Sequence, residues 1–165
     1  MKKLNQIIKY SKKPCVILLV GPPLSGKSTL CKTLENFTII SRDEIIVNLG
    51  NGLSYNDAYK TVSHKEVDKT YKAMILSSAK KKENVAIDMT SLTEKRRRCN
   101  IANFGKDYTK IAVVFPILSD IEFEKRNEKR QKEEDKFISK KVYDFMCESY
   151  KRVEKSEGFD HIIYV

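Results

Sequence analysis

A single loop motif constrains this chain more than any other feature of its sequence. Residues 21–29 read GPPLSGKST and directly follow the apolar run CVILLV at residues 15–20. The pattern GxxxxGKS/T in this context is typical of a buried strand that opens through a tight loop onto a helix. Gly21 and Gly26 let the backbone wrap a polyphosphate, with its N–H groups turned inward at a helix N-terminus. The motif therefore predicts a nucleotide-binding site.

The side chains of this loop are expected to divide the work of phosphate binding. Lys27 would direct a positive charge toward the β- and γ-phosphates of ATP, and Ser28 would offer a hydroxyl to Mg²⁺. The loop residues expected to contact the nucleotide are Gly21, Ser25, Gly26, Lys27 and Ser28. A degenerate loop that keeps the motif without the ligand is the alternative.

Size and composition limit the remaining possibilities. A chain of 165 residues suits one domain, residues 1–165. The longest apolar run is far too short to span a membrane, and we expect a cytoplasmic protein without a membrane partner or targeting segment. The four cysteines form no CxxC pair and are expected to be reduced core thiols. The formal net charge of +10 suits an anionic partner, although a lysine-rich excess is also typical of a solvated surface.

Short apolar runs alternate with helical patterns along the chain. Strands are expected at 16–20, 37–40, 85–87, 111–115 and 161–165. Ser41, Ser91 and Ser119, each followed three residues later by glutamate, are expected to cap helices. The alternation predicts an α/β fold of the P-loop NTPase type, a doubly wound parallel sheet of about five strands with helices on both faces. A stripe including Val142 and Phe145 is expected in the core.

The charged segment RNEKRQKEEDK, residues 126–136, lacks an apolar face. It is a candidate for a small mobile lid or, alternatively, for a solvated helix end. Arg126 and Arg130 lie four residues apart, so on a helix they share one face and are candidates to stabilise a transferring phosphoryl group. The alternative is that they pair with Glu122 and Glu134 on the surface.

Two aspartates follow the second and third expected strands. Asp43 lies beside Arg42 in SRDE, and Asp88 precedes Thr90 in DMT. A carboxylate near the γ-phosphate can accept a proton from an acceptor alcohol or hold a metal through water. The alternative for Asp43 is a first-turn residue favoured by the helix dipole, and for Asp88 a strand-end carboxylate that holds metal without direct catalytic work.

The segment EKRRRCN, residues 94–100, is the densest basic cluster of the chain. It is a candidate to line a groove for a nucleic-acid backbone. The alternative is that one or two of its arginines only pack their stems or pair with acidic neighbours.

Four motifs in order resemble the kinase domain of phage-type polynucleotide 5′-hydroxyl kinases, within the adenylate-kinase-like group of P-loop phosphotransferases. GPPLSGKST resembles the phosphate loop of that family and SRDE its acceptor-site Arg-Asp pair. DMTSLTEKRRR resembles its Asp-x-Thr segment with paired arginines, and FEKRNEKR resembles its lid.

The resemblance implies roles for individual side chains. Asp43 would be the general base for a 5′-hydroxyl, and Lys27 and Arg130 would stabilise the transferring phosphoryl group. Thr29 and Arg126 would join the nucleotide contacts. The acceptor side would comprise Arg42, Asp88, Thr90 and Arg97.

The implied activity is transfer of the γ-phosphate of ATP to 5′-OH ends of DNA or RNA. Ile46 stands where a relative has an arginine for an acceptor 3′-phosphate, and no phosphatase or ligase motif is present, so separate partners would supply those repair steps. The alternatives are a P-loop kinase for a nucleoside, an aminoacyl-tRNA or a small alcohol, and a nucleotide-gated nucleic-acid-binding module without transfer.

Overall fold

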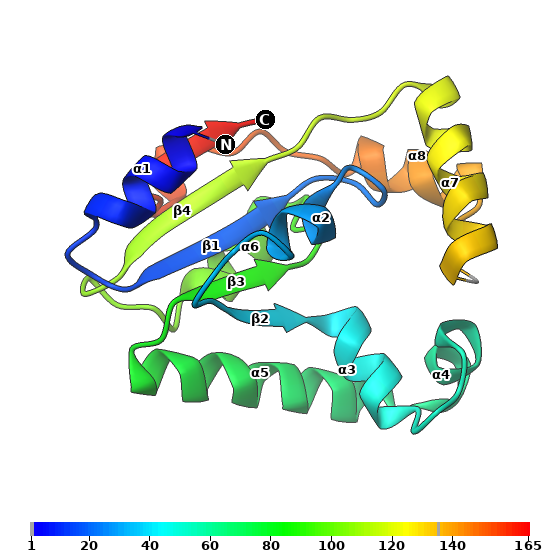
Figure 1. Ribbon diagram of the computed structural model, residues 1–165, viewed down its shortest axis with the longest axis horizontal. Helices are drawn as coiled ribbons and strands as arrows, with labels where there is room; N and C mark the ends of the chain where they lie inside the picture. Colours follow the sequence, from blue (N-terminus) through cyan, green and yellow to red (C-terminus); the bar gives the residue numbers. More distant parts are fainter. Residues whose placement is uncertain (1, 135) are drawn as a thin grey trace.

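A five-stranded parallel sheet forms the centre of the molecule (Figure 1). The computed structural model describes residues 2–134 and 136–165. The strands pair in the order β2-β3-β1-β4-β5. Their bounds are β1 Cys15–Val20, β2 Thr38–Ser41, β3 Val85–Asp88, β4 Thr109–Val114 and β5 His161–Tyr164. The predicted α/β fold with a doubly wound parallel sheet is confirmed, and each expected strand is found within two residues of its predicted bounds.

Helices cover both faces of the sheet, because the central strand β1 is apolar on both sides. Every residue of β1 is buried. Val16 and Leu18 belong to one hydrophobic cluster, whereas Ile17 and Leu19 belong to another on the opposite face, as the two-residue period of a strand requires. The helices are α1 Lys2–Tyr10, α2 Lys27–Cys31, α3 Arg42–Leu49, α4 Tyr55–Thr61, α5 His64–Lys81, α6 Glu94–Ile101, α7 Asp120–Glu134 and α8 Lys140–Glu148.

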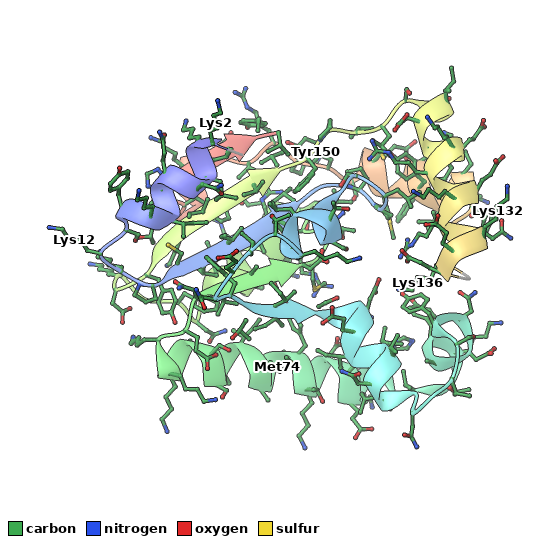
Figure 2. All side chains as sticks on the ribbon, in the orientation of Figure 1. Lys2, Lys12, Met74, Lys132, Lys136 and Tyr150 are labelled. Atoms are coloured by element: carbon green, nitrogen blue, oxygen red, sulfur yellow. The ribbon has the colours of Figure 1, made fainter. Side chains whose placement is uncertain are left out.

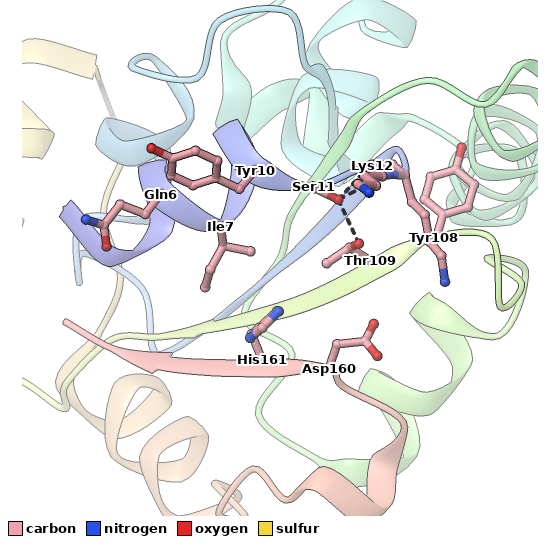
Figure 3. A pocket seen from close by; sticks show the side chains of 10 residues that line it. Gln6, Ile7, Tyr10, Ser11, Lys12, Tyr108, Thr109, Asp160 and His161 are labelled. Atoms are coloured by element: carbon pink, nitrogen blue, oxygen red, sulfur yellow. Dashed lines mark hydrogen bonds between the residues drawn. The ribbon is translucent and has the colours of Figure 1, made fainter.

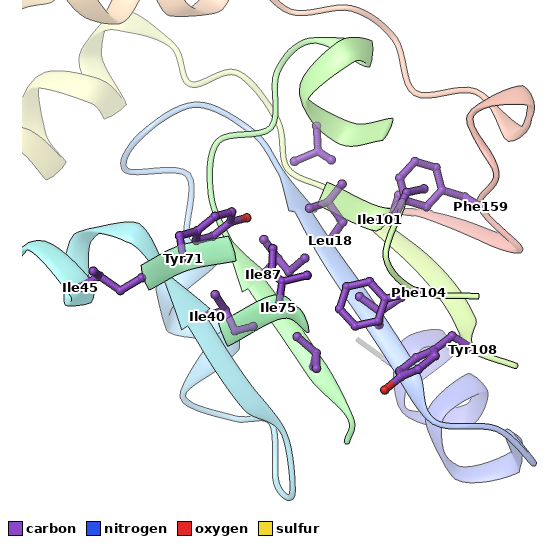
Figure 4. Close-up of a cluster of buried hydrophobic side chains, with 14 of the residues drawn as sticks. Leu18, Ile40, Ile45, Tyr71, Ile75, Ile87, Ile101, Phe104, Tyr108 and Phe159 are labelled. Carbon is purple, nitrogen blue, oxygen red and sulfur yellow. The ribbon is translucent and has the colours of Figure 1, made fainter. Parts of the chain in front are cut away.

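The two hydrophobic clusters draw on different helices. The larger one combines side chains of α3, α5 and α6 with the sheet, and Figure 4 shows Tyr71 and Ile75 of α5 beside Ile87 of β3. The second cluster contains Leu4 of α1 and Leu30 of α2. Sequence analysis did not predict α1. No helix in the described parts of the chain is long and apolar enough to cross a membrane.

Two of the three predicted helix caps are found. The amide of Glu44 donates to the Ser41 hydroxyl at the start of α3, and the amide of Glu122 donates to Ser119 before α7. The prediction for Ser91 is wrong, because Thr93 caps α6 by accepting from the amide of Arg96. Ser91 instead has a positive φ of 46° and lies two residues before that cap.

The predicted core stripe on α8 and the predicted burial of all cysteines are wrong in part. Phe145 is 73% exposed and Val142 is also exposed, because α8 packs through Tyr143, whose ring lies 4.2 Å from that of Phe123 on α7. All four cysteines are free thiols, and Cys15 and Cys31 are buried. Cys99 is exposed because it lies on the outer face of α6.

Candidate active site at the carboxyl edge of the sheet

The phosphate loop joins β1 to α2 and holds its shape through two glycines. The amide of Gly21 donates to the carbonyl oxygen of Thr90, 2.9 Å away, which ties the loop to the segment after β3. A Cβ atom at Gly21 would lie 2.8 Å from Cβ of Phe115, so this position has no room for a larger residue. Gly26 has a φ of +103°, which L side chains rarely adopt. The local geometry therefore requires the glycines of the motif.

Lys27 lies at the centre of the charged groups. Its side chain folds back over the loop, and Nζ donates to the carbonyl oxygen of Pro22 at 2.5 Å and to Ser25 Oγ at 3.3 Å. Burial lowers the pKa of Lys27 to about 8, against the negative charge of Asp88, which raises it. Arg130 lowers this pKa further and Asp43 raises it. Charges from three other elements therefore act on the Lys27 ammonium.

Ser28 and Asp88 form the group suited to a divalent cation. Ser28 Oγ donates to Asp88 Oδ2 at 2.7 Å, so a hydroxyl and a carboxylate lie side by side at the start of α2. Mg²⁺ is commonly held by such a pair together with substrate phosphates. The described parts of the chain contain no cluster of three or more His, Cys, Asp or Glu side chains for a metal. This donor set fits a Mg²⁺ ion that arrives with a nucleotide. Thr29 is exposed on the next position of α2.

Asp43 reaches the same edge through the pairing of β2 with β3. Ser41 is in register with Asp88, so the residues just after β2 begin beside the end of β3. Asp43 lies in the first turn of α3 and is partly buried. The hydroxyl of Tyr55, on α4, donates to Asp43 Oδ1 at 3.0 Å. Asp43 therefore lies in the first turn of α3 and also at the edge of the sheet that carries the phosphate loop.

Of the predicted acceptor-side residues, Arg42 is engaged by α5, whereas Thr90 lies at the phosphate loop. Arg42 Nε donates to Asp68 Oδ1 at 3.2 Å, and its Nη2 lies 3.2 Å from His64 Nδ1. Both partners belong to α5. Thr90 takes part through its backbone oxygen, which accepts from Gly21. Ile46 is completely buried and packs in the core, so this position offers nothing to an acceptor.

The two arginines of α7 lie on the side of the phosphate loop. Arg126 Nη1 donates to the carbonyl oxygen of Leu24 at 2.9 Å, and its Nε donates to Glu122 at 2.7 Å. Arg130 Nε donates to Glu134 at 3.4 Å. Each arginine therefore has its helical glutamate, as the alternative expected, and Arg126 also contacts the phosphate loop. A role of either arginine in phosphoryl transfer stays a prediction.

Arg97 occupies a different place from the one that sequence analysis predicted. Its side chain is 0% exposed and forms an ion pair with Glu157 at 2.6 Å. The remaining N–H groups donate to Glu157 Oε1 and to the carbonyl oxygens of Ser91, Leu92 and Arg152, so all five guanidinium N–H groups have acceptors. This guanidinium stabilises the fold and is not presented to an acceptor.

Sequence analysis missed the residues that bring the segment after α7 to the site. The Asn127 side chain, on α7, exchanges two hydrogen bonds with the backbone of Ile138, at 2.8 and 3.2 Å. Lys136 Nζ lies 4.4 Å from the centre of the Tyr55 ring. Within the predicted lid, residues 126–134 are helical and Asp135 lies outside the described residues. An isolated asparagine in a charged run gives no signal of such contacts.

A groove of about 530 Å³ lies at the opposite edge of the sheet, beside the start of β4 and β5 (Figure 3). Tyr10, Ser11, Thr109 and His161 are among its lining residues. Ser11 and Thr109 share a hydrogen bond of 2.8 Å across it. Its lining includes no residue of the phosphate loop, so its size alone does not connect it with nucleotide chemistry.

The strand order and the loop GPPLSGKST between β1 and α2 define a P-loop kinase-like nucleotide-binding domain. Such a domain supports phosphotransferase chemistry. The chain matches the AAA domain family over residues 16–153, and it belongs to that family. A comparison with curated proteins found no match.

Several solved structures are similar to this chain. A chain in the structure of the Pnkp1/Rnl/Hen1 RNA repair complex is 25% identical, with a TM-score of 0.66 over 84% of this chain and 44% of that one. Kti12 from Chaetomium thermophilum, in complex with ADP-AlF3, is 13% identical, with a TM-score of 0.60 over 91% and 88%. A gluconokinase from Sinorhizobium meliloti is 13% identical, with a TM-score of 0.52 over 94% and 83%.

These likenesses differ in what they support. The last two identities are so low that they show the fold alone. The present chain spans less than half the length of the repair-complex chain that it matches.

Proposed function

We propose that this chain is an ATP-dependent polynucleotide 5′-hydroxyl kinase, which transfers the γ-phosphate of ATP to 5′-OH ends of DNA or RNA. The observation that carries the proposal is that the phosphate loop, the start of α3 and the arginine-bearing helix α7 meet at one edge of the sheet. Ser41, before Asp43, is in register with Asp88, which accepts from Ser28, and Arg126 of α7 donates to the loop carbonyl of Leu24. A base, a phosphate-binding lysine and an arginine are the groups that phosphoryl transfer to an alcohol uses.

Asp43 is the proposed general base. Tyr55 holds Oδ1 of this carboxylate, so Oδ2 takes the proton of the acceptor hydroxyl as that oxygen attacks the γ-phosphorus. A pure nucleotide switch would need no base at this place. The presence of Asp43 together with the arginines of α7 therefore favours an enzyme over a binding module.

Cationic side chains of the loop and of α7 supply the rest of the proposed site. Lys27 and Arg130 offset the negative charge that spreads over the transferring phosphoryl group. Arg126, already bound to the Leu24 carbonyl, contacts the nucleotide together with the loop. Ser28 and Asp88 would hold a Mg²⁺ ion that arrives with the nucleotide, which would supply positive charge to its phosphates.

Two observations favour a polymeric acceptor over a small alcohol. The formal net charge of +10 attracts a polyanion through counterion release. The likeness at 25% identity to a chain of an RNA repair complex supports a role at nucleic-acid ends. We extend the proposal to separate phosphatase and ligase partners that would complete end repair.

A direct assay separates the candidate acceptors. The protein is incubated with γ-labelled ATP, Mg²⁺ and single-stranded DNA or RNA that ends in a 5′-OH, with matched 5′-phosphate oligonucleotides as controls. We expect label on the 5′-OH strands alone. Label on nucleosides or gluconate but not on oligonucleotides would contradict the polymer assignment. ATP-dependent binding of oligonucleotides without any transfer would contradict the assignment as a kinase.

A further inference from the structure

Three segments that are distant in sequence meet at the side chain of Tyr55. Its hydroxyl donates to Asp43 of α3 at 3.0 Å, and the Lys136 ammonium lies 4.4 Å from the centre of its ring. Lys136 lies where the segment after α7 approaches α4 (Figure 2). Tyr55 itself begins α4, and its side chain is partly buried. One residue therefore touches both the proposed base and the segment that follows Arg130.

The hydroxyl of Tyr55 is a fixed hydrogen-bond donor. Burial raises the pKa of Tyr55, and the negative charge of Asp43 together with their hydrogen bond raises it further. The phenol therefore stays protonated over the working range of an enzyme and donates to Oδ1 throughout. A carboxylate with one oxygen held in this way has little freedom to rotate, so the other oxygen keeps one direction.

The ring of Tyr55 makes the second contact. An ammonium over an aromatic face is attracted by the electron density of the ring, most strongly where water is partly excluded. Asn127 holds the backbone of Ile138, two residues after Lys136, against α7. Arg130 lies on the same helix and its positive charge acts on the pKa of Tyr55. The helix that carries Arg130 is therefore bonded to the same short segment that places Lys136 over the Tyr55 ring.

We propose that Tyr55 is a positioning residue that couples the arginine-bearing segment to the base: its hydroxyl orients Asp43, and its ring holds Lys136. The inference rests on the proposed function of this site. It assigns different tasks to the two parts of one side chain. Substitutions can therefore remove one task and leave the other.

The test compares four variants of the full chain. Tyr55→Phe keeps the ring and removes the hydroxyl, whereas Tyr55→Leu removes both. Lys136→Gln removes only the charge over the ring. Tyr59→Phe is the matched control, because Tyr59 lies on the same helix with its ring 4.9 Å from His64. The measurements are kcat and KM for transfer to a 5′-OH oligonucleotide and amide hydrogen exchange of residues 131–139.

We expect the two tasks to separate. Tyr55→Phe should lower kcat about tenfold, the size of one hydrogen bond to a charged group, with KM for ATP within about twofold of wild type. Hydrogen exchange of the 131–139 segment should stay as in wild type. Lys136→Gln should exchange several-fold faster there, and Tyr55→Leu should show both changes.

Two results would overturn the inference. One is a Tyr55→Phe variant with the kcat of wild type. The other is equal exchange in Tyr55→Phe and Tyr55→Leu. If wild-type protein transfers no phosphate to oligonucleotides, the proposed function fails separately. The exchange comparison then decides alone: faster exchange in Tyr55→Leu than in Tyr55→Phe supports the coupling, and equal exchange refutes it.

Discussion

Helices α6 and α7 both carry closely spaced arginines, yet they use them in opposite ways. Arg97 of α6 is completely buried, and Glu157 together with three backbone carbonyl oxygens accepts all of its N–H groups. Arg126 and Arg130 of α7 remain partly exposed beside the phosphate loop, each next to a glutamate of the same helix. Local density of positive charge is greater in α6, but the cations near the proposed chemistry belong to α7.

The difference lies in the partner of each guanidinium. A buried carboxylate that binds through two oxygens commits the arginine to the fold, because removing either charge leaves the other unpaired in a dry place. A partly exposed glutamate one helical turn away contributes little free energy and can be exchanged for a phosphate, which binds guanidinium more strongly. Whether an arginine is available to bind a phosphate therefore depends on its acidic partner and on its burial.

The largest effect that tests this comparison is the loss of the buried ion pair. Arg97→Met should lower the free energy of unfolding by about 3–5 kcal/mol, because Glu157 stays buried without its partner. Urea denaturation measures the change. The double variant Arg97→Met/Glu157→Leu is the control and should recover most of the stability. A loss below about 1 kcal/mol in the single variant would show that Arg97 is no more committed to the fold than a surface residue.

The second effect is on catalysis. Arg130→Ala should lower kcat for phosphoryl transfer by about 10²–10³-fold, the size expected for one cation directed at developing charge. Its free energy of unfolding should change by less than about 0.5 kcal/mol, because the pair with Glu134 is partly exposed. Steady-state kinetics and urea denaturation give the two numbers, with Arg130→Lys as the control of intermediate activity. Unchanged kcat in Arg130→Ala would remove α7 from the chemistry.

A smaller effect appears in the pH dependence of ATP binding. The pKa of Lys27 is about 8, so above this pH the nucleotide-free protein loses the ammonium that binds phosphates. We expect the Kd for ATP to rise by up to about tenfold per pH unit above pH 8, with proton uptake on binding, as measured by calorimetry in two buffers. The folded state holds this proton more weakly than the unfolded chain, so the stability of the free protein should increase as pH rises from 8 toward 10.5.

The pH dependence of ATP binding also distinguishes Arg130 of α7 from Arg97 of α6. Arg130 is among the charges that lower the pKa of Lys27, so Arg130→Ala should move the weakening of ATP binding to higher pH. Arg97→Met should not change the pH above which ATP binding weakens. The same pH dependence of ATP binding in wild type, Arg130→Ala and Arg97→Met would contradict the placement of Arg130 near the phosphate loop.

The smallest effect is expected for the exposed pair of α6. Arg98 Nε lies 2.7 Å from Glu94 Oε1, and both side chains are about half exposed. Arg98→Ala should cost only about 0.3–0.5 kcal/mol in urea denaturation and leave kcat unchanged. A tenfold loss of oligonucleotide affinity in this variant would instead return α6 to the acceptor surface.

The sheet and the phosphate loop could be predicted because their signals are local. β1 and residues 21–29 form one continuous pattern, and the ends of β2 and β3 meet because neighbouring parallel strands end at one edge. The partner of Arg97 could not be predicted, since Glu157 lies 60 residues later in the chain. The contacts of Tyr55 depend in the same way on α3, α4 and the segment after α7, whose relative positions no local pattern specifies.

The central claim is that the carboxylate of Asp43 acts on the acceptor while residues 21–29 hold the nucleotide. Single-turnover transfer of labelled phosphate by Asp43→Asn, with the Kd for ATP measured on the same protein, tests this claim most directly. We predict a loss of at least about 10²-fold in the transfer rate with ATP affinity within about threefold of wild type. Transfer at the wild-type rate by Asp43→Asn would contradict the account.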